Sequence, residues 1–487
     1  MSNRPTNILF LFTDQHRLSA VGCYGETPCQ TPSIDRLAAE GVRFENAYTV
    51  CPVCSPARGT IMTGLYPHAH GICSNVHNLG SSVHELEDRP ELLSRRLGAA
   101  GYGLGYSGKW HLGTERERSF CQSSKPSLPK HVGFEGQNFP GHGGGGFQYP
   151  EYKAYLQEHG YTHRVSRLDE SGMRDGGELA GAGRAPPPDF LAGNTTAFMG
   201  RFRGQGRPVF IWPHKRGAPR AHCAPEEYVD MYRDAEIPEW PNYHWPSRAV
   251  PGAHWNKIHP RHEHMTWSDW AESIRYYYAF TTMIDGQLGR ILEHLEDTGL
   301  DRDTVVIFSA DHGETCGSHG GLTDKGYHHF EETHHIPLIV RFPDGRQAGT
   351  TIDAFASLAD IYPTILSLAG VDHDPTALHG SSLLPLVNGA TDRWRDCVVT
   401  EFSGVNSVSL TQRTLRCSHL KYGFNCCGPD ELYDLSTDPW ETLNRIDHPD
   451  YREAGRELRQ RLLEWMEETS DPVLGVFRRM KVGYYDG

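Results

Sequence analysis

The stretch Ile8–Gln15 reads ILFLFTDQ, so that five consecutive apolar residues lead directly into a polar end. A short, continuous apolar run of this kind is typical of a strand that is buried on both faces of a sheet. The run Val305–Ala310 has the same character, and Asp311-His312 follows it at once. The two stretches therefore predict two buried strands, each followed directly by polar residues that include a carboxylate.

Apolar strand patterns alternate with helical patterns along most of the chain. The longest helical pattern is Thr266–Thr298, in which apolar residues recur on one face and Gly299 follows as a stop. Strands that alternate with helices predict an α/β fold with a large, mostly parallel central sheet flanked by helices. The other predicted strands are Gly103–Lys109, Val209–Trp212 and Pro337–Arg341, and the other predicted helices are Leu92–Ala100 and the helix that Thr31-Pro32-Ser33 opens.

The pattern changes after Asp392. Short segments there predict an antiparallel sheet, and Arg452–Met466 predicts an amphipathic helix whose apolar residues face inward. We therefore expect a main domain over residues 1–392 and a small C-terminal α+β subdomain over residues 393–487. The predicted short strands are Val398–Phe402, Thr414–Tyr422 and Glu431–Tyr433.

The composition describes an acidic, histidine-rich protein. The 487 residues include 47 Lys and Arg against 61 Asp and Glu, which gives a net charge of −14, and 28 histidines. Binding to nucleic acid requires clustered Lys and Arg, so we expect no nucleic-acid partner. Histidines and carboxylates together favour a metal or acid–base site.

The sequence contains no segment that resembles a signal or a membrane span. The first apolar run is shorter than the about 7–15 residues of a secretory signal, and nothing approaches the about 18 apolar residues of a span. Twelve cysteines in so long a chain do not indicate a disulfide scaffold. We therefore expect a cytoplasmic protein with reduced thiols and no membrane partner.

The two strand ends are candidates for a metal site. Asp14-Gln15 follows the first strand, and Asp311-His312 follows the second. In parallel α/β sheets, ligands gather outside the carboxyl ends of the strands. Carboxylates beside further oxygen and nitrogen donors suit a hard cation. The alternative is that each aspartate only caps the turn or helix that follows it.

Lys109 and His111 stand two residues apart in Gly108–Gly113. On an extended backbone their side chains would point to one side, and Trp110 would point to the other side, into the core. A Lys and a His on one face can hold an anion and move a proton. The alternative is a solvated edge strand.

The segment Cys54-Ser55-Pro56-Ala57-Arg58 predicts the start of a helix, because Ser and Pro favour the first helical positions. Cys54 then lies at a helix N-terminus, where backbone amides favour anions, and Arg58 lies one turn further on. Cys51 and Cys54 also form a C-x-x-C, which is found in redox pairs and in half of a zinc site. The sequence contains no second C-x-x-C.

The same segment resembles the C-x-P-x-R sequence of the type I sulfatases, in which an enzyme oxidises the cysteine to formylglycine. Further motifs of that family follow in the family's order over nearly the whole chain. The resemblance implies the alkaline phosphatase-like fold, a catalytic domain in residues 1–392, and hydrolysis of a sulfate monoester. These motifs are Thr13-Asp14-Gln15, Thr31–Asp35, Arg58-Gly59-Thr60, Met62-Thr63-Gly64, Gly108–Gly113, Ser309–Glu314, His319-Gly320-Gly321, Lys325, Ile336-Pro337-Leu338 and Glu431–Leu435.

The resemblance also implies the chemistry of residue 54. A serine nucleophile would leave a sulfated enzyme that needs a second attack by water. Hydrated formylglycine carries two hydroxyls on one carbon, so that one attacks sulfur and the other later expels sulfate. A formylglycine-generating enzyme would be a partner during maturation, and the substrate would be a small aryl or sugar sulfate.

Roles for the other residues follow from the same resemblance. Lys109 and Lys325 would neutralise sulfate oxygens, Arg58 would hold the formylglycine, and His111 would move protons. The implied metal ligands are Asp14, Gln15, Cys54, Asp311 and His312, with Asp311 also placed to accept the proton of the nucleophile. Calcium is the usual ion of the family.

Two positions depart from the family's pattern. Many sulfatases carry Asp-Asp after the first strand and Asp-Asn after the later one, whereas this chain has Gln15 and His312 at the second places. These residues also resemble the phosphonate monoester hydrolase branch, in which manganese is a candidate, and magnesium is possible as well. The alternatives are thus a phosphonate monoester or phosphate diester hydrolase with the same machinery and, from another class, a non-catalytic binding protein.

The histidine that assists the leaving group has two candidates. The family's usual Pro-His pair would fall on Ala218-Pro219, and the nearby histidines are His214 and His222. We favour His222, because the predicted helix Glu226–Tyr232 directly follows it. The sequence specifies neither the particular substrate nor the oligomeric state.

Overall fold

The computed structural model describes residues 6–76, 78, 81–114, 127–139, 148–167, 176–181, 186–216, 222–245, 264–390, 392, 394–405 and 409–482. Its main sheet has eight strands, in the order β12 (Thr350–Ile352), β2 (Val42–Phe44), β11 (Leu338–Arg341), β10 (Thr304–Ala310), β1 (Asn7–Asp14), β8 (Val209–Arg216), β4 (Gly103–Gly108) and β5 (Glu135–Gly136). Within this sheet only β11 runs antiparallel to its neighbours. The predicted large, mostly parallel sheet is therefore confirmed.

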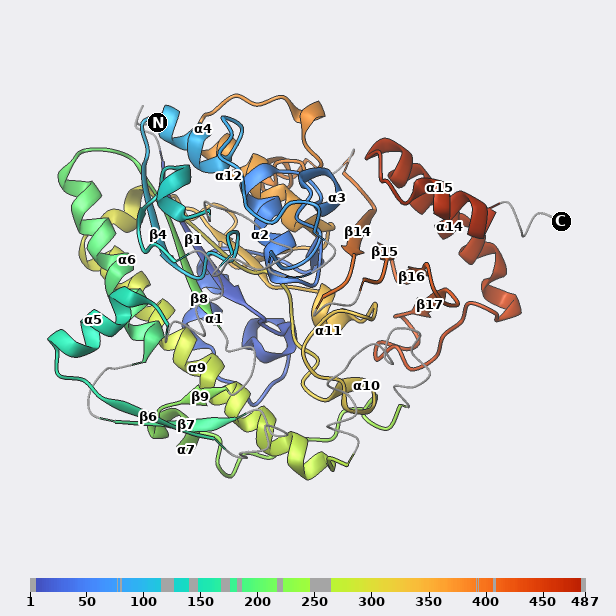
Figure 1. The fold of residues 1–487 in the computed structure, drawn as a ribbon, viewed down its shortest axis with the longest axis horizontal. Helices are drawn as coiled ribbons and strands as arrows, with labels where there is room; N and C mark the ends of the chain where they lie inside the picture. The colour runs from blue at the N-terminus through green and yellow to red at the C-terminus, as the bar shows by residue number, and fades with distance from the viewer. Residues whose placement is uncertain are drawn as a thin grey trace.

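β1 lies in the middle of the sheet, and its side chains alternate between two cores. Ile8, Phe10 and Phe12 pack into one core and Leu9 and Leu11 into the other, each at most 1% exposed. The prediction of a strand buried on both faces is confirmed. The first core includes residues of the helices α2 (Cys54–Thr63), α4 (Leu93–Ala99) and α12 (Ile361–Leu368). The second core includes residues of α1 (Pro32–Glu40), α6 (Pro187–Gly204) and α9 (Trp267–Asp297). Figure 1 shows where these helices lie around the main sheet.

β1 and β10 run side by side in parallel, from Asn7 beside Thr304 to Thr13 beside Ala310. The backbone amide of Asp311 continues the pairing, because it donates to the carbonyl oxygen of Thr13 over 3.1 Å. The carboxyl ends of the two strands therefore meet at one edge of the sheet, although nearly 300 residues separate them in the chain.

Helix α9 also holds the N-terminus of α1. Its buried Asp285 accepts hydrogen bonds from the backbone amides of Ser33 at 3.0 Å and Ile34 at 2.8 Å. The first amides of a helix have no partner within the helix, and a carboxylate there is favoured by the helix dipole. Burial nevertheless raises the pKa of Asp285 to about 6, against the effect of these hydrogen bonds.

The C-terminal part forms a second sheet with its own core. Its strands are antiparallel and lie in the order β14 (Cys397–Phe402), β15 (Gln412–Cys417), β16 (Leu420–Asn425) and β17 (Glu431–Asp434). Helix α14 (Arg452–Glu468) packs Leu458 and Leu462 against it, as predicted (Figure 1). The predicted single strand Thr414–Tyr422 is wrong, because the chain turns at Ser418 and His419 and pairs with itself as β15 and β16.

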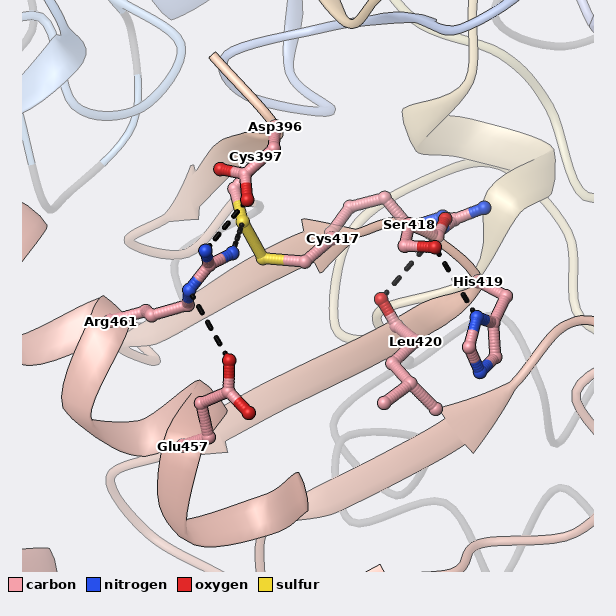
Figure 2. The surroundings of a disulfide bond; sticks show 9 residues. Asp396, Cys397, Cys417, Ser418, His419, Leu420, Glu457 and Arg461 are labelled. Atoms are coloured by element: carbon pink, nitrogen blue, oxygen red, sulfur yellow. Dashed lines mark hydrogen bonds and ion pairs between the residues drawn. A yellow bond between two sulfur atoms is a disulfide. The ribbon is translucent and has the colours of Figure 1, made fainter.

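A disulfide joins Cys397 of β14 to Cys417 of β15, which lie directly opposite each other in the sheet. Figure 2 shows Arg461 of α14 beside it, with the guanidinium donating to the Cys397 sulfur over 2.8 Å and to Asp396 over 2.6 Å. The expectation that all cysteines are reduced thiols is therefore wrong at this pair. The physical reason is the antiparallel register, which places the two side chains on one face of neighbouring strands.

Strand β14 connects the second sheet to the segment that precedes α2. Thr400 donates from its hydroxyl to the carbonyl oxygen of Thr49, and the amide of Glu401 donates to that of Val50, each over 2.7 Å. The division of the chain at residue 392 stays a prediction. Within the part of the chain that the structure describes, no helix has the length and apolar character needed to cross a membrane.

Candidate active site

The site is built where β1 and β10 end. The backbone of Gln15 turns at a φ of 57°, and its amide donates to Asp311 Oδ1 over 3.0 Å. The amide of His312 donates to the same oxygen, also over 3.0 Å. Asp311 therefore caps a turn through Oδ1, as the alternative proposed. Its other carboxylate oxygen, Oδ2, accepts a hydrogen bond from Arg58.

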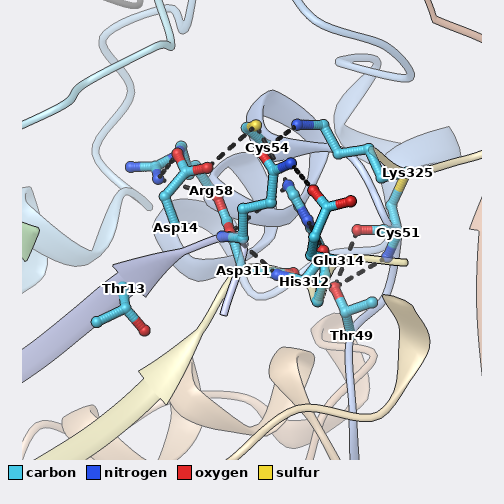
Figure 3. Close-up of polar contacts among 12 residues, drawn as sticks. Thr13, Asp14, Thr49, Cys51, Cys54, Arg58, Asp311, His312, Glu314 and Lys325 are labelled. Atoms are coloured by element: carbon cyan, nitrogen blue, oxygen red, sulfur yellow. Dashed lines mark hydrogen bonds and ion pairs between the residues drawn. The ribbon is translucent and has the colours of Figure 1, made fainter. Parts of the chain in front are cut away.

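Cys54 reaches the strand ends from the start of α2. Its sulfur lies 3.3 Å from His312 Nε2 and 3.9 Å from Asp14 Oδ1, and the residue is 1% exposed. Figure 3 shows the three side chains together with Asp311 and Lys325. The helix N-terminus is held by Asn75, whose side-chain oxygen accepts from the amide of Ser55 over 3.2 Å. The predicted position of Cys54 at a helix N-terminus is confirmed.

Three cations surround this group. Arg58 donates through Nη2 to Asp14 over 3.2 Å and to Asp311 over 3.0 Å. Lys109 Nζ contacts Asp14 Oδ2, and Lys325 Nζ donates to Gln15 Oε1 over 3.1 Å. All three cationic side chains are buried. The structure therefore brings Arg58, Lys109 and Lys325 together around the strand ends.

The cations change the acidity of Cys54. Burial raises the pKa of the thiol, and so does Asp14, but Lys109, Lys325 and His312 outweigh them and lower that pKa to about 7. Burial also disfavours the ammonium of Lys325, yet the surrounding negative groups, above all Asp324, hold its pKa above the usual range. The site thus favours negative charge at residue 54 and retains its positive charges at neutral pH.

The residues present fit a divalent cation. The ligand atoms of Asp14, Cys54, Asp311 and His312 all lie within 4.8 Å of one another, and all four residues are buried. Two carboxylates and one imidazole are suitable donors for calcium, magnesium or manganese. The sulfur of Cys54 marks the place of the oxygen that formylglycine would carry. Gln15 Oε1, which accepts from Lys325 Nζ over 3.1 Å, would add an uncharged oxygen donor.

The segment Lys109–His111 differs from the prediction in its backbone. β4 ends at Gly108, and His111 has a φ of 55°, so that the segment is not extended. The solvated edge strand is also wrong, because Lys109 is 0% and His111 1% exposed. Trp110 packs against Tyr106 in the core, as predicted. The carbonyl oxygen of His111 accepts from the Ser55 hydroxyl over 2.7 Å, which ties the segment to α2.

The two leaving-group candidates occupy different places. The ring of His222 packs against Tyr277 of α9 at a centroid distance of 4.9 Å, and burial lowers its pKa to about 4. The Tyr277 hydroxyl in turn donates to the carbonyl oxygen of Gln15 over 3.1 Å. His214 belongs to β8, where its backbone pairs with Phe12 of β1. The choice of His222 stays a prediction.

Two carboxylates of the site were not predicted. Gln15 Nε2 contacts Glu314 Oε2 and donates to Asp324 Oδ1 over 3.2 Å. Glu314 follows Asp311-His312 by two residues, so the sequence shows a nearby carboxylate but not its direction. Asp324 precedes Lys325 in the chain, and no motif in the sequence marked it as a residue of the site. The C-x-x-C alternative gains no support, since Cys51 and Cys54 are not bonded to each other.

Comparison with known proteins places the chain among sulfatases. A family model described as Sulfatase matches residues 6–371, and one described as N-sulphoglucosamine sulphohydrolase, C-terminal, matches residues 317–468. The chain is 27% identical over 484 residues to an ulvan-active sulfatase of Formosa agariphila, across 96% of this chain and 83% of that protein. It is 26% identical over 516 residues to an N-acetylglucosamine-6-O-sulfatase of Bacteroides thetaiotaomicron, across 96% and 88%.

The fold has close counterparts among solved structures. The phosphonate monoester hydrolase of Agrobacterium radiobacter superposes with a TM-score of 0.78 over 96% of each chain, at 24% sequence identity. At this identity the likeness shows a shared fold. Taken with the family models, it assigns the main sheet and the C-terminal sheet to one known architecture.

Proposed function

The chain belongs to the sulfatase family and is a sulfatase, and from this premise we propose that it hydrolyses a sulfate monoester with residue 54, as formylglycine, acting as the nucleophile. One observation carries the proposal: Cys54 lies at a helix N-terminus within contact of His312 and Asp14 and is ringed by buried cations. A sulfate group is a compact anion, and a buried cationic pocket binds such an anion and stabilises the charge that builds up on it.

Residues of this chain would hold and serve a metal. Asp14, Gln15, Asp311, His312 and the oxygen of formylglycine 54 would bind a divalent cation, for which calcium is the first candidate and manganese or magnesium the next. When bound, such an ion supplies Lewis acidity and lowers the pKa of a hydroxyl that it contacts. Asp311 would also accept the proton of the nucleophile; it belongs to the same compact group of ligand atoms as Cys54.

The cations would divide the remaining work. Lys109 contacts Asp14, Lys325 bonds to Gln15, and both would bind the sulfate oxygens. Arg58 bonds to both aspartates and would keep them oriented. His111 would move protons during release of sulfate.

Protonation of the leaving group is the weakest step that these residues support. A general acid must carry a proton at the working pH, and a pKa of about 4 leaves His222 neutral near pH 7. We therefore propose that the enzyme favours sulfate esters whose alcohol is a good leaving group, such as aryl sulfates. The named activities of the two relatives also make sugar sulfates candidates.

The test is turnover of an aryl sulfate by protein made in a host with a formylglycine-generating enzyme. Mass spectrometry of the peptide around residue 54 should show a loss of about 18 Da, which replacing CH2SH by CHO requires. Release of inorganic sulfate together with this mass loss supports the proposal. Unmodified cysteine and no turnover would instead favour a non-catalytic binding protein.

A second function is favoured by the donor set. Gln15 and His312 lower the formal negative charge of the site and resemble the phosphonate monoester hydrolase branch. Rates on an aryl sulfate and on the matching phenyl phosphonate monoester, measured with one enzyme preparation, separate the two. A large preference for the phosphonate would contradict the sulfatase proposal and support the alternative.

A further inference from the structure

The side chain of Gln15 is held at both ends of its amide. Nε2 contacts Glu314 Oε2 and donates to Asp324 Oδ1 over 3.2 Å, while Oε1 accepts from Lys325 Nζ over 3.1 Å. Gln15 itself is 3% exposed. Figure 3 shows Lys325 above Glu314, both on the right of the site in this view. The amide therefore has one orientation that satisfies all its partners.

Glu314 is itself fixed in place. Its Oε1 accepts from the backbone amides of Asp324 at 2.6 Å and Cys316 at 3.2 Å, and the residue is 3% exposed. Two amide donors on one oxygen leave the other oxygen, Oε2, for Gln15. The carboxylate cannot rotate away without losing these bonds, and losing them would leave buried amides without partners.

We propose that Glu314 is a positioning residue that fixes the amide of Gln15 so that its oxygen, and not its nitrogen, faces the metal. An amide nitrogen carries two protons and has no lone pair for a cation, whereas the oxygen has two lone pairs. One lone pair accepts from Lys325, and the other remains for the ion. Partners of this kind behind a metal ligand orient the ligand and strengthen metal binding.

The same contacts explain why this position carries an amide. A carboxylate at position 15 would face Glu314 and Asp324 and add a third negative charge at hydrogen-bond distance. A glutamine donates to both carboxylates instead. This inference rests on the metal centre of the proposed function.

The experiment measures metal affinity without substrate. The matured enzyme is stripped with a chelator and titrated with Ca²⁺ or Mn²⁺ against a fluorescent chelator. In Glu314→Gln, the new amide oxygen keeps the two backbone amide donors, so that the new NH2 faces Gln15 Nε2 and drives the Gln15 amide to flip. We expect metal affinity to fall by about 10- to 100-fold, with little change in the thermal midpoint.

The decisive variant is the double exchange Gln15→Glu with Glu314→Gln. It reverses the donor and the acceptor, keeps the charge of the pair, and returns an oxygen to the metal. We expect it to regain most of the lost affinity. Wild-type affinity in Glu314→Gln, or a double variant that binds no better than Glu314→Gln, would overturn the proposal, because a merely structural role predicts no such rescue.

Two further variants complete the design. Glu332→Gln changes a mostly buried carboxylate in the same part of the chain, whose described partners are Arg17, Asn242 and His319, and should leave metal affinity unchanged. If Glu314→Gln does not fold, Asp324→Gly removes the second acceptor of the Gln15 amide at a position with a φ of 69° and should weaken binding in the same direction. Unchanged affinity in Asp324→Gly would then contradict the proposal. The metal titration uses no sulfate ester, so its result can be interpreted even if the sulfatase proposal fails.

Discussion

At the scale of single residues, Arg58 links the charges of the active site. Its guanidinium bonds to Asp14 and Asp311, which come from different strands. Burial disfavours this cation, but the two carboxylates outweigh the effect and hold the pKa of Arg58 above its usual range. Breaking a buried ion pair from one side leaves an uncompensated charge and costs about 3–5 kcal/mol. The site residues therefore act as one coupled unit.

Cys54 is the residue whose loss should separate chemistry from folding. Cys54→Ala should reduce turnover of an aryl sulfate to the background rate, because it removes the nucleophile. The thermal midpoint should change little, since removing one small buried atom costs roughly 1 kcal/mol. Cys51→Ala is the matched control, because Cys51 is equally buried and lies outside the four-residue metal group. Loss of activity in both variants would favour a C-x-x-C function instead.

The candidate site was predictable where residue type and position sufficed. Asp14, Asp311 and His312 follow apolar strands, and Cys54 begins a helix, so their convergence at one sheet edge follows from the fold class. Glu314 was not predictable, because the direction of a side chain in an irregular turn depends on its backbone partners. The predicted extended backbone at Lys109–His111 was wrong, because β4 ends at Gly108 and His111 has a positive φ.

At the scale of elements, helix α1 depends on a carboxylate from α9. Asp285 supplies the N-terminal cap that the sequence of α1 lacks, since Thr31 makes no side-chain cap bond. Periodicity predicted both helices, but it could not show that one caps the other. The β15–β16 turn was missed for a related reason, because alternating residues on both sides of Ser418 and His419 continue the strand pattern through the turn.

Asp285 should give the stability of the protein a measurable pH dependence. Its pKa rises from 3.8 in the unfolded chain to about 6 in the folded protein, so the folded state binds this proton more tightly. Its contribution is present below pH 3.8 and is lost as the pH rises to about 6, by up to about 3 kcal/mol. The urea midpoint of the wild type should therefore fall relative to Asp285→Asn between pH 4 and 7. Parallel curves for the two proteins would contradict this.

The disulfide of the second sheet should stabilise β14 against β15. It closes a loop across a sequence separation of 20 residues, for which a disulfide typically contributes about 3 kcal/mol. Reductant should therefore lower the thermal midpoint of the wild type and have no such effect on Cys397→Ser/Cys417→Ser. If reductant lowered the thermal midpoint of both proteins equally, the loss of stability would be due to other cysteines.

At the scale of the whole molecule, the second sheet supports the active site. Thr49 donates from its hydroxyl to the carbonyl oxygen of Asp311 over 2.6 Å and is itself bonded by Thr400 of β14. The C-terminal part thus reaches Asp311 through a single intervening residue. This contact was beyond sequence reasoning, which treated residues 393–487 as a separate subdomain.

His68 joins the two parts at a second place. Its ring, at the start of the short helix α3 (Pro67–His70), contacts Glu401 of β14 and the carbonyl oxygen of Thr469 beyond α14. Burial would lower the pKa of His68, but the bond and charge of Glu401 and the Thr469 carbonyl outweigh it and raise that pKa. His68 therefore links the segment after α2 to the C-terminal part of the chain.

This link predicts a loss of stability at alkaline pH. A raised folded pKa means that the contribution of His68 is complete below its ordinary pKa of 6.5 and is lost as the pH rises through the raised value. The thermal midpoint of the wild type should fall relative to His68→Asn from pH 6 to 8. His419→Asn, at an exposed site, should leave the pH profile unchanged. A constant difference between wild type and His68→Asn would refute the link.

The sequence by itself determined the mostly parallel α/β sheet, the order of its main elements and the chemical types at the two strand ends. It could do so because burial patterns and helix starts are local and repeat over a few residues. Only the tertiary structure decided the reversal of β11, the Cys397–Cys417 pair and the direction of Glu314. These depend on contacts between segments far apart in the chain, which no local pattern encodes.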